Sequence, residues 1–358
     1  MTALANREQT AATGRSTDGP ATVRAARGSL RRRTVGVCVV LGLVALALFW
    51  ASLLVGDFPL SARDVFFSLT GRGTRATDFV IYDLRLPRVI TGLLVGVAFG
   101  ISGAVFQALI RNPLASPGVI GITSGASASA VLAILVLGLS GAVVSVFACT
   151  GALITAVVIY LLSWRHGIAG SRLVLVGIGV AAVLQAVINY QMTRVGVADA
   201  QVALLWLTGS LNGASSSGVR PLALLLLVLV PITLGLARWL RGLQLGDDTA
   251  TAIGLRVERS RLLLMGCWMA LAAVATAAAG PVGFVAFVSG PVARRLTRAS
   301  GAALVPAALV GACVVCLADF AGQHLLPVQL PVGVLTAAVE APHLLYLLVV
   351  SNRVGHAG

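Results

Sequence analysis

The sequence is dominated by apolar runs that are each long enough to cross a lipid bilayer. A hydrocarbon core about 30 Å thick is crossed by about 20 apolar residues in an α-helix. Nine runs of this kind cover residues 35–55, 89–110, 119–139, 142–163, 173–192, 219–237, 262–279, 302–320 and 332–350. A tenth, shorter run over 282–292 lies between Pro281 and Arg294-Arg295. We therefore expect an all-α, polytopic membrane protein with about ten transmembrane helices.

The basic residues assign a side of the membrane to each connecting segment. All 26 basic residues are arginine, against 12 acidic residues, and cytoplasmic loops carry the excess of positive charge in membrane proteins. With ten helices and a cytoplasmic N-terminus, 19 arginines lie inside and seven lie outside. With nine helices, the arginine-containing segments near the C-terminus would lie outside the cell, which is the side that this rule disfavours. The protein is thus expected to have both termini in the cytoplasm.

The flanking segments differ in composition from the apolar body. Residues 1–34 are rich in Ala, Thr, Ser, Gly and Arg without apolar periodicity, which predicts a disordered cytoplasmic tail. Residues 35–353 form the predicted transmembrane domain, with a cytoplasmic loop at 241–259, and residues 354–358 form a short cytoplasmic tail. Within the second span, Gly92, Gly96 and Gly100 repeat every four residues, a pattern that lets helix backbones approach closely.

Composition excludes several function classes. With 58% hydrophobic and 11% charged residues, the chain is far more apolar than a soluble domain, where about 25% of residues are charged. It contains no lysine, so it lacks the residue on which a P-loop ATPase depends. Its four histidines and few carboxylates suggest neither a metal cluster nor a catalytic triad. The net charge of +14 reflects topology, so no nucleic acid partner is expected. A transport protein that binds no metal or cofactor is the simplest class, and a membrane enzyme has no residues to support it.

Two segments at the ends of the second span carry unusual polar residues. Arg85-Leu-Pro-Arg88 precedes the span, and its arginines either anchor the helix at lipid headgroups or pair with carboxylates of an external partner. The span closes with Gln107-x-x-x-Arg111-Asn-Pro-Leu-Ala-Ser-Pro117. A polar residue in an apolar run, such as Gln107, often faces the bundle interior or a pathway.

Two further segments do not resemble ordinary spans or loops. In the cytoplasmic loop 245–255, Asp247 and Asp248 are predicted to cap a short helix and Gly254 to end it. This helix is either a docking element or an ordinary capped loop helix. The segment 280–295 has Gly-Pro near both ends, which predicts a broken helix whose freed backbone groups are satisfied by neighbours or water.

Asp319 and Glu340 are the ionisable residues predicted within the later spans. Asp319 lies near the outer end of the ninth span, and Glu340 lies midway along the tenth, beside Pro342 and His343. A charge at this depth is costly, so such residues are candidates for function. The alternative to a functional role is that each residue is protonated or is paired for structural reasons.

Taken in order, these segments resemble the permease family of bacterial ABC importers for iron–siderophores, haem and cobalamin (the FecCD type). The resemblance runs from about residue 40 to residue 350. Its motifs are Arg85-Leu-Pro-Arg88, Ile101-Ser-Gly-Ala-Val-Phe-Gln107, Arg111-Asn-Pro-Leu-Ala-Ser-Pro117, Trp206-Leu-Thr-Gly-Ser210, 245–255, 280–294 and Leu330-Pro-Val-Gly333. The family fold, that of a type II ABC importer permease, has ten helices per subunit, in agreement with the independent count.

The resemblance implies partners and residue roles. Two permease subunits pair around a pathway in the bacterial cell membrane, two ATPase subunits bind ATP and Mg²⁺ below them, and an extracytoplasmic lipoprotein or periplasmic protein delivers the chelate. Arg85 and Arg88 are implied to dock that binding protein, and Asn112 and Leu114, with Gln107 nearby, to form the gate and pathway. The implied coupling to the ATPase involves Leu245, Gly246, Asp247, Asp248, Ala250 and Gly254.

Three positions depart from the family pattern. Gly290-Pro291 stands where Pro-His is usual, Gln323 stands where an arginine often follows Asp319, and Glu340 stands where glycine is usual. The first two departures are most similar to ferric-enterobactin-type permeases, which usually form heterodimers with a second permease, although a homodimer stays open. The alternative function is a ten-helix secondary transporter or channel that works without an ATPase.

Overall fold

The computed structural model describes residues 19–56, 58–112, 117–164, 170–299 and 301–355. In these ranges the chain is helical throughout, with no strand. Each of the ten predicted spans corresponds to a helix. These helices are α2 (Gly19–Leu54), α5 (Leu86–Ile110), α6 (Ile122–Leu135), α7 (Ala142–Ser163), α8 (Gly170–Met192), α10 (Ser216–Gly235), α13 (Val257–Ala279), α14 (Val285–Thr297), α15 (Leu304–His324) and α16 (Val332–Gly355).

Seven helices in the described ranges are long and apolar enough to cross a membrane, which makes this a multi-pass membrane protein. By contrast, α6 and α14 have 14 and 13 residues. At 1.5 Å per residue they reach only about 20 Å, short of the ~30 Å hydrocarbon core. These two helices therefore start or stop inside the bundle, where neighbouring helices must satisfy their ends.

The structure differs from the sequence predictions at both ends of the chain. Helix α2 starts at Gly19, so the prediction of a disordered tail is wrong for residues 19–34, and residues 1–18 lie outside the described ranges. Pro20 suits the first turn of a helix, and the alanines and arginines that follow are strong helix formers. Helix α16 extends to Gly355, two residues into the predicted C-terminal tail.

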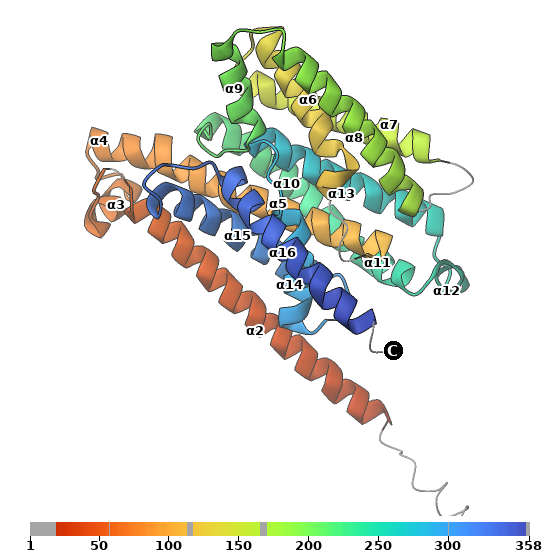
Figure 1. Cartoon of the computed structure of the whole chain (residues 1–358). Helices are drawn as coiled ribbons and strands as arrows, with labels where there is room; N and C mark the ends of the chain where they lie inside the picture. The colour runs from red at the N-terminus through yellow and green to blue at the C-terminus, as the bar shows by residue number, and fades with distance from the viewer. Residues whose placement is uncertain (1–18, 57, 113–116, 165–169, 300, 356–358) are drawn as a thin grey trace, which may run out of the picture.

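Short helices connect the long ones and mark two opposite ends of the bundle. The helices α3 (Ala62–Leu69), α4 (Arg75–Asp78) and η1 (Phe79–Arg85) lead into α5, α9 (Val197–Leu207) follows α8, and α11 (Ala237–Gln244) and α12 (Asp247–Ala252) precede α13. Figure 1 shows α3 and α4 at one end and α12 at the other, and we call these the α3 end and the α12 end. The start of α2 and the end of α16 lie toward the α12 end.

Helix α5 forms the centre of the bundle and packs against α13, α14 and α15. A Cβ atom on Gly96 would overlap the backbone of Gly311 and Ala312 on α15, and one on Gly100 would overlap Ala307. The predicted glycine stripe thus brings the backbones of α5 and α15 into contact, as small residues do in membrane bundles.

The outer helices present apolar side chains outward. Leu224 and Leu227 on α10 are 64% and 71% exposed, and Leu161 on α7 and Val183 on α8 are similarly exposed. Exposed apolar faces of this kind suit a lipid surface or another subunit. The polar candidates for function are instead found along the central helix α5 and at its two ends.

Candidate functional site at the two ends of α5

Helix α5 carries a polar cluster at each end. Its 25 residues span about 37 Å at 1.5 Å per residue, so the clusters lie on opposite sides of an apolar layer. The cluster at the α3 end contains Arg88, Asn212, Asp319 and Gln323, and we call it the Arg88 cluster. The cluster at the α12 end contains Arg111, Asp247 and Arg261, and we call it the Asp247 cluster.

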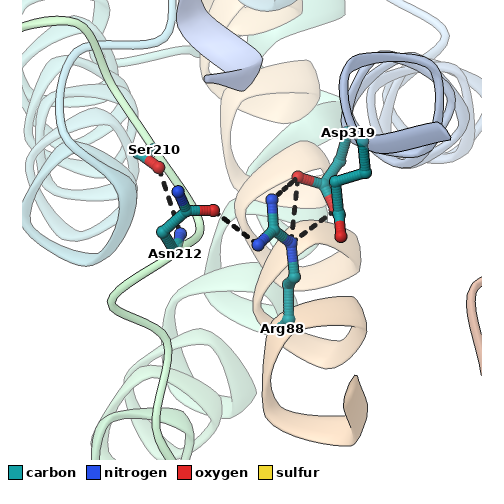
Figure 2. A network of polar contacts seen from close by, with 5 residues as sticks. Arg88, Ser210, Asn212 and Asp319 are labelled. Carbon is teal, nitrogen blue, oxygen red and sulfur yellow. Dashed lines mark hydrogen bonds and ion pairs between the residues drawn. The ribbon is translucent and has the colours of Figure 1, made fainter. Parts of the chain in front are cut away.

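The Arg88 cluster joins three parts of the chain through one guanidinium group (Figure 2). Arg88 Nε lies 2.9 Å from Asp319 Oδ2, and Arg88 Nη2 lies 2.8 Å from Asp319 Oδ1. Arg88 Nη1 donates to Asn212 Oδ1, and Gln323 Nε2 donates to Asp319 Oδ2 at 2.7 Å. Asp319 is only 5% exposed, and a buried carboxylate needs such partners. The structure thus shows Asp319 paired with Arg88, whereas its role in function stays a prediction.

Arg85 binds a different part of the chain from Arg88. Its Nη1 atom donates to the Leu53 carbonyl at 2.7 Å, and its Nη2 atom donates to the Phe58 carbonyl at 2.6 Å. These bonds tie η1 to the end of α2 and to the segment after it. The two arginines of the motif are therefore both engaged within the chain, and docking by either one would require it to share or exchange these partners.

The Asp247 cluster attaches the short helix α12 to the two long helices α5 and α13. Arg261 Nη2, on α13, lies 2.9 Å from both carboxylate oxygens of Asp247. Arg111, which follows α5, places Nη2 at 3.4 Å from Asp247 Oδ1 and at 2.7 Å from the Leu243 carbonyl. The Asp247 carboxylate thus links α12 to the end of α5 and the start of α13.

The predicted short helix exists, with one correction at its start. The N-cap of α12 is Gly246, with φ of +109°, and Asp247 and Asp248 occupy the first turn instead of capping the helix. Negative charge in the first turn is favourable because the helix N-terminus is partly positive. Gly254 ends the helix as predicted, with φ of +83° and with the Leu255 N–H bonded to the Ala250 carbonyl.

Around α12, apolar side chains point away from the bundle. Leu245 and Ile253 are 64% and 60% exposed, whereas Ala250 is fully buried. The helix is thus attached to the bundle through Ala250 and Asp247. It leaves two large apolar groups uncovered at the α12 end, outside the apolar layer, and exposed apolar groups at such a position suit a protein partner.

Gln107 lies in the bundle interior, one of the two predicted alternatives. It is 2% exposed, and its Nε2 atom donates to the Phe287 carbonyl on α14 at 2.8 Å. Asn112 is exposed just past the end of α5, where its N–H bonds to the Gln107 carbonyl at 3.2 Å. Leu114, the other predicted gate residue, lies outside the described residues.

Glu340 is half-buried and lies against the start of α14. Its Oε2 atom lies 2.8 Å from the position that a Cβ would take on Gly283, the residue before Phe284. On the same helix, the His343 ring packs edge-on against Phe284, with the ring centroids 5.5 Å apart.

Three motifs that are far apart in the sequence meet in one backbone junction. Gly333 N–H donates to the Gly209 carbonyl at 3.0 Å, and Ser210 N–H donates to the Ala279 carbonyl at 2.8 Å. A Cβ on Gly209, Gly280 or Gly333 would overlap a backbone carbonyl of the junction. This explains why Trp206–Ser210, 280–294 and Leu330–Gly333 are glycine-containing motifs. The role of Asn212 was not predicted, because one asparagine in a polar connection gives no signal by itself.

The comparisons with known proteins agree with this architecture. Residues 43–350 match the model of the FecCD transport family. The chain is 40% identical to the ferric enterobactin transport system permease protein FepG of Escherichia coli (strain K12), over 89% of this chain and 95% of that protein. It is also 40% identical to the achromobactin transport system permease protein CbrC of Dickeya dadantii (strain 3937), over 88% and 92%.

A more distant relative and a solved structure extend the comparison. The iron(3+)-hydroxamate import system permease protein FhuG of Bacillus subtilis (strain 168) is 36% identical, over 88% of this chain and 97% of its own length. A solved metal-chelate type ABC transporter in an inward-facing conformation superimposes with a TM-score of 0.78 at 26% identity. That match covers 88% of this chain and 99% of the solved chain.

Proposed function

Because this chain belongs to the FecCD transport family, we propose that it is the permease subunit of a bacterial ABC importer for an iron–siderophore complex. The relatives named above are permease proteins for ferric enterobactin, achromobactin and iron hydroxamates. The structural observation that carries the proposal is α12, which is flanked by the exposed Leu245 and Ile253 while Asp247 contacts Arg111 after α5 and Arg261 on α13.

The mechanism is alternating access powered by a partner. ATP-driven closure of two ATPase subunits displaces α12, and the Asp247 cluster passes the displacement to α5 and α13. These two helices move together because Ser102 Oγ donates to the Trp268 carbonyl at 2.9 Å and the Phe106 and Trp268 rings pack 4.7 Å apart. The bundle then shifts between two orientations.

ATP and Mg²⁺ are bound by the ATPase subunits, and the absence of lysine from this chain supports that division.

The α12 end and both termini face the cytoplasm, as the 19 inside arginines indicate. Asn112 and Leu114 contribute to the cytoplasmic gate. At the α3 end, Arg85 and Arg88 lie on the face that receives the extracytoplasmic binding protein.

The second permease is proposed to be a different chain. The ferric enterobactin system of Escherichia coli has two permease proteins, FepG and FepD, and this chain is 40% identical to the first and 35% identical to the second. The likeness to both supports a heterodimer assembled from two related subunits.

The test of the ATPase partnership is copurification. This chain is expressed with a candidate second permease and a candidate ATPase subunit from the same organism, and Leu245→Asp and Ile253→Asp are compared with the wild type. Each substitution places a charge on the apolar surface around α12 and is expected to abolish ATPase copurification. Val328→Asp is the matched control, because Val328 is 67% exposed in the segment after α15. Uptake that persists without any associated ATPase would favour the secondary transporter or channel.

The substrate class is tested by growth. A strain that lacks this chain is supplied with ferric enterobactin, ferric achromobactin or an iron hydroxamate as its sole iron source. The proposal predicts that restoring the chain restores growth on at least one of the three. Equal growth with and without the chain on all three would contradict an iron–siderophore substrate.

A further inference from the structure

Helix α14 begins inside the bundle, with unusual backbone just before its start. Its 13 residues reach only about 20 Å, less than the ~30 Å hydrocarbon core, and its start is buried, with Phe284 8% and Val285 0% exposed. Phe284, its N-cap, has φ of +64°, and Gly280 just before has φ of +72°. The first N–H groups of a helix have no partner within the helix. At this depth they need one from another part of the protein.

Glu340 lies beside this start, on α16. Its Oε2 atom is 2.8 Å from the position that a Cβ would take on Gly283, next to the first N–H groups of α14. A carboxylate at a helix N-terminus is also favoured by the helix dipole. The resemblance places glycine at this position, so the contact depends on a residue in which this chain departs from the family pattern.

Gln107 supplies a second partner in the middle of α14. In an uninterrupted helix the Phe287 carbonyl accepts the N–H of residue 291, but residue 291 is proline and has none. Gln107 Nε2 donates to that carbonyl at 2.8 Å instead. The other atom of the same amide, Oε1, lies 3.4 Å from Arg294 Nη2 on the next turn. Gln107 therefore replaces the hydrogen bond that Pro291 removes.

We propose that Gln107 and Glu340 are positioning residues that fix the register of α14 against α5 and α16, and that this register must be released for the importer to change conformation. Helix α14 is held by side chains of its neighbours at the two points where its own backbone bonding is interrupted. These bonds can be exchanged without unfolding the helix. The first test below concerns the hydrogen bond from Gln107 to the Phe287 carbonyl. The second test also rests on the proposed transport function.

The first test is a double-mutant cycle between Gln107 and Pro291. Gln107→Leu leaves the buried Phe287 carbonyl without its donor, and we expect a fall in Tm of roughly 2–4 °C or more in the purified permease complex. Pro291→Ala supplies the missing N–H within α14. In that background Gln107→Leu is expected to change Tm by less than half as much. An equal fall in Tm in both backgrounds would overturn the assignment of Gln107.

The second test measures ATP hydrolysis by the complete importer in liposomes, with ATP as the only added ligand. If the register opposes the conformational change, Gln107→Leu and Glu340→Leu raise basal hydrolysis by about fivefold, since a fivefold rate change needs only ~1 kcal/mol of barrier. Glu340→Gln keeps an acceptor oxygen beside Gly283 at the start of α14, so it is expected to stay within about twofold of the wild type.

The outcomes of the second test separate the inference from the proposed function. Complexes of Gln107→Leu and Glu340→Leu that assemble but hydrolyse ATP at the wild-type rate would show a structural role only and would overturn the release step. Glu340→Gln that behaves like Glu340→Leu would overturn the role of an acceptor oxygen at the start of α14. A wild-type chain that binds no ATPase contradicts the proposed function instead, and leaves the double-mutant cycle as the test of this inference.

Discussion

Arg88 and Asp319 form an ion pair that joins the start of α5 to the end of α15, with both carboxylate oxygens and two guanidinium nitrogens engaged at 2.8–3.2 Å. Asp319 is almost completely buried, whereas the Arg88 side chain is 18% exposed. The residue that sequence analysis placed in docking is therefore also a structural link between the two helices that pack most closely.

Removing the carboxylate should destabilise the bundle. Asp319→Ala leaves Arg88 largely buried beside Asn212 alone, and breaking a buried pair from one side costs about 3 kcal/mol. We expect a lower Tm in detergent for this variant. Asp83→Ala is the control, because Asp83 is exposed and forms no ion pair within the described residues. Equal Tm values for the two variants would contradict the structural role of the pair.

Exchanging the two charges separates docking from stability. Arg88→Glu places a second carboxylate against Asp319 and should lower both Tm and binding-protein affinity. Arg88→Asp combined with Asp319→Arg restores an ion pair and should recover part of the Tm. The affinity for the binding protein should stay low, most clearly at low ionic strength, where screening is weak. Full recovery of the affinity would exclude a docking role for the position of Arg88.

Asp247 and Asp248 are neighbours with different roles in α12. Asp247→Asn weakens the contacts to Arg261 and Arg111 and should lower substrate uptake per ATP hydrolysed. We expect about a twofold to fivefold reduction, since an exposed pair contributes at most ~1 kcal/mol. Asp248→Asn, at an exposed position without an ion pair in the described ranges, should leave that ratio near the wild-type value. Substrate uptake and ATP hydrolysis are measured in the same proteoliposomes.

Gly103 lies where the backbones of α5 and α14 touch. A Cβ at this position would overlap the Ala286 carbonyl group, so Gly103→Ala forces the helices apart and should cost about 1–3 kcal/mol. Gly42→Ala on α2 is the control, because a Cβ there meets no atom within 4 Å. The prediction is a clear fall in Tm for the first variant only, and it fails if both variants match the wild type.

The membrane class, the helices that correspond to the ten spans and the short helix near Asp247 can all be predicted from the sequence. These features depend on local properties, since an apolar run of about 20 residues has few alternatives to a helix in a bilayer. Gly254 ends α12 as predicted because a positive φ is a property of the residue itself. The tail at 19–34 was misjudged because helix propensity there was given less weight than polarity.

The pairing of the polar residues depends on how the helices pack in three dimensions. Arg88 and Asp319 are 231 positions apart, and Gln107 is 180 positions from the Phe287 carbonyl that it binds. No periodicity relates residues at such separations, because the partner of a buried polar group is set by which helices pack together. Gln107, Asp319 and Glu340 are therefore recognisable in the sequence as polar residues in apolar surroundings, whereas their neighbours are set by the packing of α5, α14, α15 and α16.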